Sequence, residues 1–214
     1  LTAVNGSLVL GAGGVAGRLS ATVASVGLPE VSLSSVALAV NTSTAAVDDL
    51  PAGPYLRVEA LGAGLSVGGQ TLSADLAFEK STDAAGASVI VAAVTNLTLV
   101  VTAGGSPVVS LTDGEGVVLL STAGIAARAS GTLAVTVPGV TLTGALELQL
   151  NTTPALVNRV VTVGGSPLLL ALPAGAANAD YLRLAGTGLV VEGLRQRLAG
   201  DVVVERVGAD TRLV

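Results

Sequence analysis

The chain lacks several of the side chains on which protein chemistry most often depends. It contains no cysteine, histidine, tryptophan or methionine, and its only aromatic residues are Tyr55, Phe78 and Tyr181. The absence of cysteine excludes a disulfide framework, a thiol nucleophile and a cysteine-ligated metal. The absence of histidine excludes the usual acid–base shuttle and most catalytic triads. We therefore expect that the protein is not an enzyme and that it binds no cofactor.

Charge is scarce too. Charged residues make up 12% of the chain, and 15 acidic residues against 10 basic ones give a net charge of −5. The basic residues are scattered, so the chain has no electrostatic footprint for nucleic acid. No apolar run approaches the roughly 18 residues that a membrane-spanning helix needs, so we expect no transmembrane segment. Hydrophobic residues make up 50% of the chain, which favours a folded core of Val, Leu, Ala and Gly over disorder.

What the chain does contain is an internal repeat. Residues 1–18 align without a gap on residues 111–128, with seven of the eighteen positions identical. Further along, LSADLAFEK (72–80) aligns on LAGDVVVER (198–206), which retains the acidic pairs Asp75/Asp201 and Glu79/Glu205. We infer two units, residues 1–110 and residues 111–214, the second incomplete at its C-terminal end. Such self-similarity is typical of repeat proteins, in which each unit buries its apolar face against its neighbour.

The second unit carries an additional segment, VTVGGSPLLLAL, at 161–172. The first unit has no counterpart at the equivalent place, although a near twin, VTAGGSPVVSL, stands at 101–111. The chain has no methionine with which translation could begin, so these residues are either a processed product or a window cut from a longer tandem array. We expect the window.

Hydrophobic residues recur at every second position almost throughout the chain. Between residues 140 and 151, for example, Leu142, Leu146 and Leu148 alternate with Thr143 and Glu147. This alternation predicts strands with one buried and one wet face, and the short Gly- and Pro-containing links between them predict antiparallel neighbours. We expect an all-β, mainly antiparallel fold in the form of an elongated tandem-repeat sheet or sandwich stack. A β-solenoid or a folded-over β-groove is the alternative.

The alternation changes phase once in the first unit. Val31 and Leu33 are odd-numbered, whereas Val36, Leu38 and Val40 are even-numbered. A one-residue offset would turn one of these sets away from the buried face. The sequence therefore predicts a β-bulge or kink at Ser34–Ser35.

Candidate sites are few. Asp113 and Glu115 fall in a predicted loop and are weak candidates for calcium ligands, because oxygen-rich loops can bind calcium. Turn formation is the better explanation of such carboxylates. We predict no metal site from motifs. Asn5, Asn41, Asn96 and Asn151 begin N-x-S/T sequons and are possible glycosylation sites if the protein is secreted. The alternative is that Asn-Thr simply ends a strand. The repeated Tyr-Leu-Arg at 55–57 and 181–183 predicts cross-strand contacts of its Tyr and Arg with Glu79 or Glu205.

The strings LPAGPYLRVEALGAGLSVGGQTLSADLAFEK and VPGVTLTGALELQLNTT resemble tandem β-rich repeats of very large bacterial cell-surface or secreted proteins. The resemblance covers nearly the whole chain. It implies an extracellular or cell-surface, fibrous or adhesive setting in a bacterium, and it implies no catalytic residues.

We therefore predict a structural or adhesive repeat module that assembles end to end through β-strand edges. Its partners would be copies of itself or adjacent repeats of the same chain. The expected assembly edges lie at Leu1, Leu8 and Leu10 on one side and at Val202 and Val204 on the other. The alternative is an envelope module that binds lipid in a hydrophobic groove.

Overall fold

The structure is a computed structural model that describes residues 1–11, 13–174, 180–207 and 210–213. Every regular element in these ranges is a β-strand. In chain order the strands are β1 (Thr2–Gly11), β2 (Gly14–Thr22), β3 (Val31–Ser32), β4 (Ser35–Asn41), β5 (Tyr55–Val67), β6 (Gln70–Thr82), β7 (Ser88–Ala103), β8 (Ser106–Ser121), β9 (Gly124–Val137), β10 (Val140–Asn151), β11 (Val157–Val163), β12 (Ser166–Leu172), β13 (Tyr181–Gly193), β14 (Gln196–Val207) and β15 (Asp210–Leu213).

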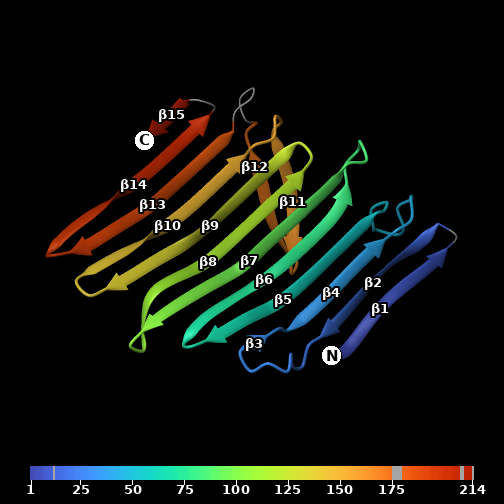
Figure 1. Ribbon diagram of the computed structural model, residues 1–214, viewed down its shortest axis with the longest axis horizontal. Helices are drawn as coiled ribbons and strands as arrows, with labels where there is room; N and C mark the ends of the chain where they lie inside the picture. The colour runs from blue at the N-terminus through green and yellow to red at the C-terminus, as the bar shows by residue number, and fades with distance from the viewer. Residues whose placement is uncertain (12, 175–179, 208–209, 214) are drawn as a thin grey trace.

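Thirteen of the strands form one open sheet in the order β1-β2-β4-β5-β6-β7-β8-β9-β10-β13-β14-β15, with β3 beside β5 (Figure 1). All ladders among these strands are antiparallel, and most neighbours in the sheet are also neighbours in the chain. Strands β11 and β12 form a separate hairpin that crosses one face of the large sheet. The predicted all-β, mainly antiparallel fold is confirmed, in the form of an extended sheet. No helix in the described part of the chain is long and apolar enough to cross a membrane.

The two faces of the large sheet differ in chemistry, as the alternation predicts. Cross-strand partners share a face, so the register identifies its rows of side chains. One row contains Leu19, Leu38, Val58, Phe78, Ala92, Val118, Ala127, Leu150 and Leu182. The next row but one contains Val36, Ala60, Leu76, Val94, Gly116, Ala129, Leu148, Leu184 and Val204. We call this side the apolar face, and the opposite side, which carries the hairpin, the polar face.

Residues with positive φ mark a line of irregularity across the sheet. At each of these positions two residues of one strand oppose a single residue of its neighbour, which defines a β-bulge. The positions are Ala3, Gly62, Asn96, Asp113 and Gly188. Bulges increase local twist and bend the strand, so the long strands of this sheet are not straight.

Asp75 and Asp201, the acidic residues that both units retain, form hydrogen bonds with residues at these bulges. The Asp75 carboxylate accepts hydrogen bonds from the Gly62 backbone N–H at 2.6 Å and from Asn96 Nδ2 at 2.7 Å. The Asp201 carboxylate accepts one from the Gly188 backbone N–H at 2.7 Å. The two units therefore hold equivalent bulges in the same way.

The predicted kink in the first unit lies on the same line. The chain leaves regular strand geometry at Leu33–Ser34, between β3 and β4. Val31 lies opposite Leu65 and Val36 opposite Ala60, so both remain on the apolar face. The predicted kink is confirmed, one residue earlier than Ser34–Ser35. The β-bulge lies in the neighbouring strand β5, which has one extra residue relative to β6 at Gly62, at the level of this interruption.

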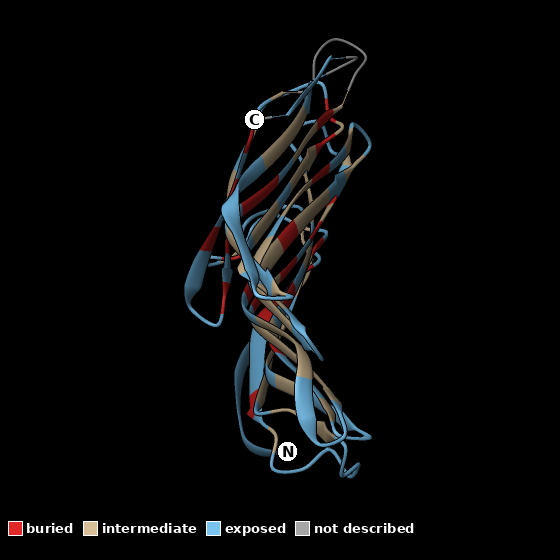
Figure 2. Cartoon of the chain, turned by 90° about the vertical axis from the view of Figure 1, so that its left-hand side faces the viewer, coloured by how far each residue is buried: buried red, intermediate tan, exposed pale blue. Residues whose placement is uncertain are grey.

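Buried residues are few (Figure 2). Most of them lie on the polar face or in the two segments that cover it, whereas Ala21 and Ala74 lie on the apolar face. The larger cluster lies beneath the β11–β12 hairpin. A smaller one, formed by Ala16, Ala39, Leu50 and Tyr55, lies beneath the loop between β4 and β5. That loop occupies, in the first unit, the place at which the second unit inserts its hairpin.

Candidate functional site

The β11–β12 hairpin joins the two units. It leaves the sheet after β10 and crosses back over β9, β8, β7 and β6, which belong to both units. Its inward side chains alternate along each strand, as expected for a hairpin with one buried face. They are Val161, Val163, Leu168, Leu170 and Leu172, each exposed by 5% or less. Beneath them lie Ala77, Val91 and Ala93 of the first unit and Val117 and Ala126 of the second. The seam between the units is therefore a shared apolar core.

The turn of this hairpin explains its twin sequence. Gly164 and Gly165 have φ of 57° and 86°, and Gly104 and Gly105 have φ of 61° and 80°. Two consecutive residues with positive φ form the type I′ turn that suits a tight hairpin, and glycine adopts it without strain. The same Gly-Gly-Ser-Pro motif thus makes the same turn twice. One turn lies within the large sheet, between β7 and β8, and the other lies in the hairpin across its face.

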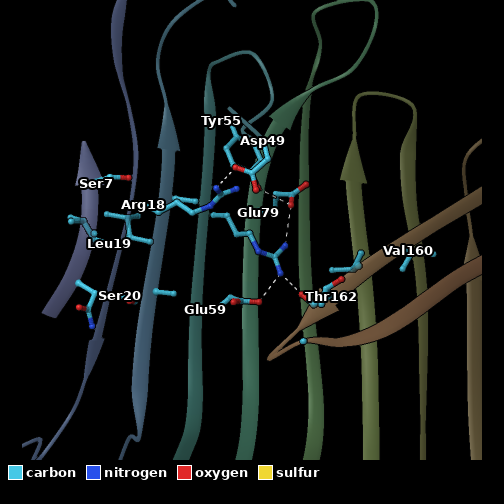
Figure 3. A pocket seen from close by; sticks show the side chains of 18 of the residues that line it. Ser7, Arg18, Leu19, Ser20, Asp49, Tyr55, Glu59, Glu79, Val160 and Thr162 are labelled. Atoms are coloured by element: carbon cyan, nitrogen blue, oxygen red, sulfur yellow. Dashed lines mark hydrogen bonds and ion pairs between the residues drawn. The ribbon is translucent and has the colours of Figure 1, made fainter. Parts of the chain in front are cut away.

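A network of ion pairs continues the seam beyond the apolar core (Figure 3). The Arg57 guanidinium donates to Glu59 Oε1 at 2.7 Å and to Glu79 Oε2 at 3.1 Å. It also donates to the backbone carbonyl of Thr162, in the hairpin. On the other side of Glu79, the Arg159 guanidinium of β11 lies 2.5 Å from Oε1. Glu79 therefore bridges an arginine of the first unit and an arginine of the second.

Burial and neighbouring charge shift the ionisation of this network. Burial alone would lower the pKa of Arg57, but its hydrogen bonds and charge interactions with Glu59 and Glu79 outweigh burial and raise that pKa. Burial raises the pKa of the Tyr55 phenol, and the Glu79 carboxylate 3.4 Å away raises it further. At neutral pH the arginine is charged and the tyrosine neutral, so neither is poised to transfer a proton.

An open groove of about 810 Å³ lies beside the network, between the hairpin and the polar face of β1, β2, β4 and β5. Its wall includes an ion pair between Arg18 and Asp49, which are 48% and 73% exposed at their side chains. Three arginines and three carboxylates line the groove, namely Arg18, Arg57, Arg159, Asp49, Glu59 and Glu79. Since each of these groups is paired with another of the set, the arrangement is suited to holding chain segments together.

The second unit has a related but looser network. Glu147 lies 3.5 Å from Arg183 and 3.6 Å from Arg128, and Arg128 lies 3.6 Å from Glu115. The Tyr181 hydroxyl donates to Gln149 Oε1 at 3.0 Å. The predicted Tyr-Leu-Arg contact with glutamate is thus confirmed in the first unit, at Glu79. In the second unit Arg183 lies opposite Glu205 in the ladder but forms its ion pair with Glu147.

Asn41 and Asn151, two of the predicted glycosylation sites, are the last residues of β4 and β10 and are 0% exposed. The Asn41 Nδ2 donates to Ala45 O at 2.9 Å and Pro51 O at 2.7 Å, and the Asn151 Nδ2 donates to Ala155 O and Pro173 O at the same two distances. Their Oδ1 atoms accept from the backbone N–H and the hydroxyl of the residue two positions later. In the folded chain these side-chain amides hold the loop that follows each strand. Asn41 and Asn151 therefore fit the alternative interpretation, in which the Asn of the sequon ends a strand.

Asn5 and Asn96 are exposed, and they stay predictions as glycosylation sites. The Asn5 amide donates to Ala3 O, and the Asn96 amide donates to Asp75. Asp113 and Glu115 lie within β8 and not in the loop that the sequence predicts. Asp113 occupies a bulge, and Glu115 accepts from Ser130 Oγ at 3.2 Å. Among the described residues, no three His, Cys, Asp or Glu side chains gather closely enough to hold a metal ion.

The predicted assembly edges lie at opposite ends of the sheet (Figure 1). Leu8 and Leu10 are in β1, which within the described residues pairs only with β2, and Leu1 directly precedes it. Val202 is in the part of β14 whose partners, among the residues that the structure describes, all belong to β13. Val204 differs, because β15 lies beside it and Leu213 is its partner.

Two members of the ion-pair network, Arg159 and Thr162, could not be predicted from the sequence. Arg159 lies in β11, and alternation does not indicate where β11 packs on the sheet, so its pairing with Glu79 could not be expected. Thr162 contributes a backbone carbonyl, which leaves no trace in the sequence.

Comparison of the chain with models of protein families, with curated protein sequences and with solved structures finds no match.

Proposed function

We propose that the chain is a structural or adhesive repeat module of an extracellular bacterial surface protein or filament, and not an enzyme. Its units join end to end through β-strand edges. The observation that supports this most directly is the seam at the unit boundary. The boundary at residues 110 and 111 falls inside β8, and β8 is paired along its length with β7 of the first unit and β9 of the second. Units of this kind share backbone hydrogen bonds where they meet.

The repeat alignment indicates how a further unit would join. Strand β1 aligns on the second half of β8, so Leu8 corresponds to Val118. Strand β15 pairs with β14 as β7 pairs with β6, because Arg206 lies opposite Thr211 just as Lys80 lies opposite Ile90. Leu213 therefore corresponds to Ala92.

Within the chain, Ala92 of β7 lies opposite Val118 of β8. Repetition of that seam would place Leu213 of one unit opposite Leu8 of the next, whether the next unit belongs to a longer chain or to another copy. Exposed edge strands form such pairs readily, since their N–H and C=O groups are unsatisfied on one side.

The test is cysteine cross-linking, for which a chain without native cysteine is well suited. Mild oxidation of a chain carrying Leu8→Cys and Leu213→Cys should give a ladder of covalent oligomers. The matched control carries Val9→Cys with Leu213→Cys, because Leu8 and Val9 are 50% and 51% exposed but project to opposite faces of β1. Equal cross-linking by both pairs, or by neither, would contradict the proposed register.

A second candidate function rests on a separate observation. The apolar face carries a groove of about 400 Å³ whose lining is almost wholly apolar. It is lined in part by Val26, Val31, Leu33, Leu72, Leu76 and Val94. Such a groove could hold an acyl chain in an envelope protein that binds lipid. Native mass spectrometry of the purified protein tests this, since retained lipid would favour it and a lipid-free mass would count against it.

A further inference from the structure

We propose that the apolar face of the sheet is the contact surface between two copies of this chain, which pack face to face as a two-layer sandwich. This lateral contact is separate from the end-to-end contact through strand edges. It arises from an imbalance in the fold, because the hairpin covers part of the polar face while the apolar face has no comparable cover among the described residues. An antiparallel sheet with one polar face ordinarily buries its apolar face against another layer.

Exposure of large apolar side chains on this face is extensive. In the rows defined above, Val58 is 38% exposed, Leu76 43%, Leu148 43% and Leu184 48%. Phe78, the only phenylalanine of the chain, lies on this face in β6 and is 39% exposed. Contiguous apolar surface of this kind on a soluble protein marks an interaction site.

The area is sufficient for a stable dimer. The eight neighbouring strands from β5 to β14 are each 12 or more residues long. At a spacing of about 4.8 Å between strands and about 3.4 Å per residue, they present a face of about 1,500 Å². A stable protein–protein interface needs about 800 Å² per partner, so even partial overlap of two such faces would satisfy it.

The distribution of large and small side chains on the apolar face is complementary to that of a second copy of the same face. Strands β8 and β9 carry mainly small side chains in its central rows, at Gly114, Gly116, Ala127, Ala129 and Gly131, and Val118 on β8 is the larger exception. Larger side chains flank this trough, at Leu148 and Leu150 on the adjacent β10 and, beyond Ala92 and Val94 of β7, at Leu76 and Phe78 on β6. A two-fold arrangement can set the β10 ridge of each copy into the β8–β9 trough of the other, as an isologous interface requires.

Charge favours a second copy over an anionic membrane as the occupant. Among the described strand residues from β4 to β14, only Lys80 and Arg206 place a charged side chain on the apolar face, and both lie toward its margin. The remaining strand charges lie on the polar faces, which point away from each other in a sandwich. A chain with a net charge of −5 would be repelled by anionic lipid.

The test combines sedimentation equilibrium with two lysine variants. Leu148 and Leu169 are 43% and 47% exposed, but Leu148 lies on the apolar face and Leu169 on the outward side of the hairpin. We expect the wild type to be dimeric and Leu148→Lys to weaken the dimer by at least about tenfold, because a buried unpaired charge is costly. Leu169→Lys should leave the dimer unchanged.

A gentler variant keeps the test decisive if Leu148→Lys fails to fold. The thiol of Leu148→Cys should be alkylated several-fold more slowly at protein concentrations that favour the dimer than on dilution, whereas that of Leu169→Cys should react at the same rate at both concentrations. A wild type that stays monomeric, a dimer that Leu148→Lys leaves intact, or a face occupied by co-purified lipid would each overturn the proposal.

Discussion

The guanidinium of Arg159 in β11 lies 2.5 Å from the carboxylate of Glu79 in β6, a residue 80 positions earlier in the chain. The hairpin that carries Arg159 belongs to the second unit, and Glu79 belongs to the first. This contact, together with the apolar side chains under the hairpin, makes the two units interdependent.

Loss of either partner should destabilise the folded chain. Both side chains are only partly exposed, Glu79 by 16% and Arg159 by 32%, so Glu79→Gln should lower the free energy of unfolding by about 1–2 kcal/mol. A double-mutant cycle with Arg159→Gln should give a coupling energy of about 1 kcal/mol. Arg197→Gln provides the control, because its pair with Glu192 is exposed at 62% and 54% and should contribute little. A cycle that shows no coupling between Arg159 and Glu79 would contradict the prediction that this ion pair stabilises the contact between the two units.

The asparagine that ends β10 should be a major determinant of stability. Asn151→Ala removes the amide hydrogen bonds to Ala155 and Pro173 and leaves the backbone N–H of the buried Thr153 without its acceptor, at a cost of about 2–3 kcal/mol. Asn41→Ala should behave alike, because its bonds are the same. Asn5→Ala, at an exposed position, should change stability by less than about 0.5 kcal/mol. Equally small changes for all three variants in denaturant unfolding would mean that Asn41 and Asn151 are merely surface sequons.

The apolar core of the seam should tolerate truncation poorly. Leu170 is 0% exposed beneath the hairpin, so Leu170→Ala should cost about 2–5 kcal/mol. Leu169→Ala, in the same strand but 47% exposed, is the matched control and should cost far less. Equal thermal shifts for the two variants would mean that the hairpin does not pack on the sheet.

The two tyrosines should titrate late. Burial raises the pKa of both phenols above the ordinary value of 10.0, and the nearby Glu79 and Glu205 carboxylates add to the shift. Because the folded state holds these protons more tightly than the unfolded state, stability is unaffected below about pH 10 and falls as pH rises through the folded pKa. With no tryptophan in the chain, tyrosinate absorbance reports this directly, and Tyr55→Phe leaves Tyr181 as the single signal. Ionisation of the folded protein at the ordinary pKa would contradict the burial of these rings.

Local features of the fold could be predicted because they depend on neighbouring residues. Alternation identifies the strands. The phase change before Val36 predicts a bulge or kink at Ser34–Ser35, because only an offset keeps both apolar sets on one face, and the structure places the interruption at Leu33–Ser34. The Gly-Gly turns follow from backbone freedom alone.

The placement of the hairpin could not be predicted, for a physical reason. Alternation in 161–172 shows that one side of the hairpin must be buried, but every strand of the sheet offers a surface that could bury it. Only tertiary packing selects the polar face over β6 to β9, and with it the pairing of Arg159 and Glu79. The calcium and glycosylation candidates depended equally on context, since the sequons at Asn41 and Asn151 are buried by loops whose folding the motif does not encode.

Cooperativity of unfolding tests the central claim, a common core shared by two repeat units, most directly. Tyr55→Phe and Tyr181→Phe each leave one tyrosine, which reports the second and the first unit respectively in denaturant titrations followed by tyrosine fluorescence. Shared packing across β7, β8 and the hairpin predicts that the transition of each variant coincides with the one that circular dichroism records for the same variant. If the tyrosine of either unit unfolded at a clearly separate midpoint from the bulk of its own chain, the units would be independent and the account would be wrong.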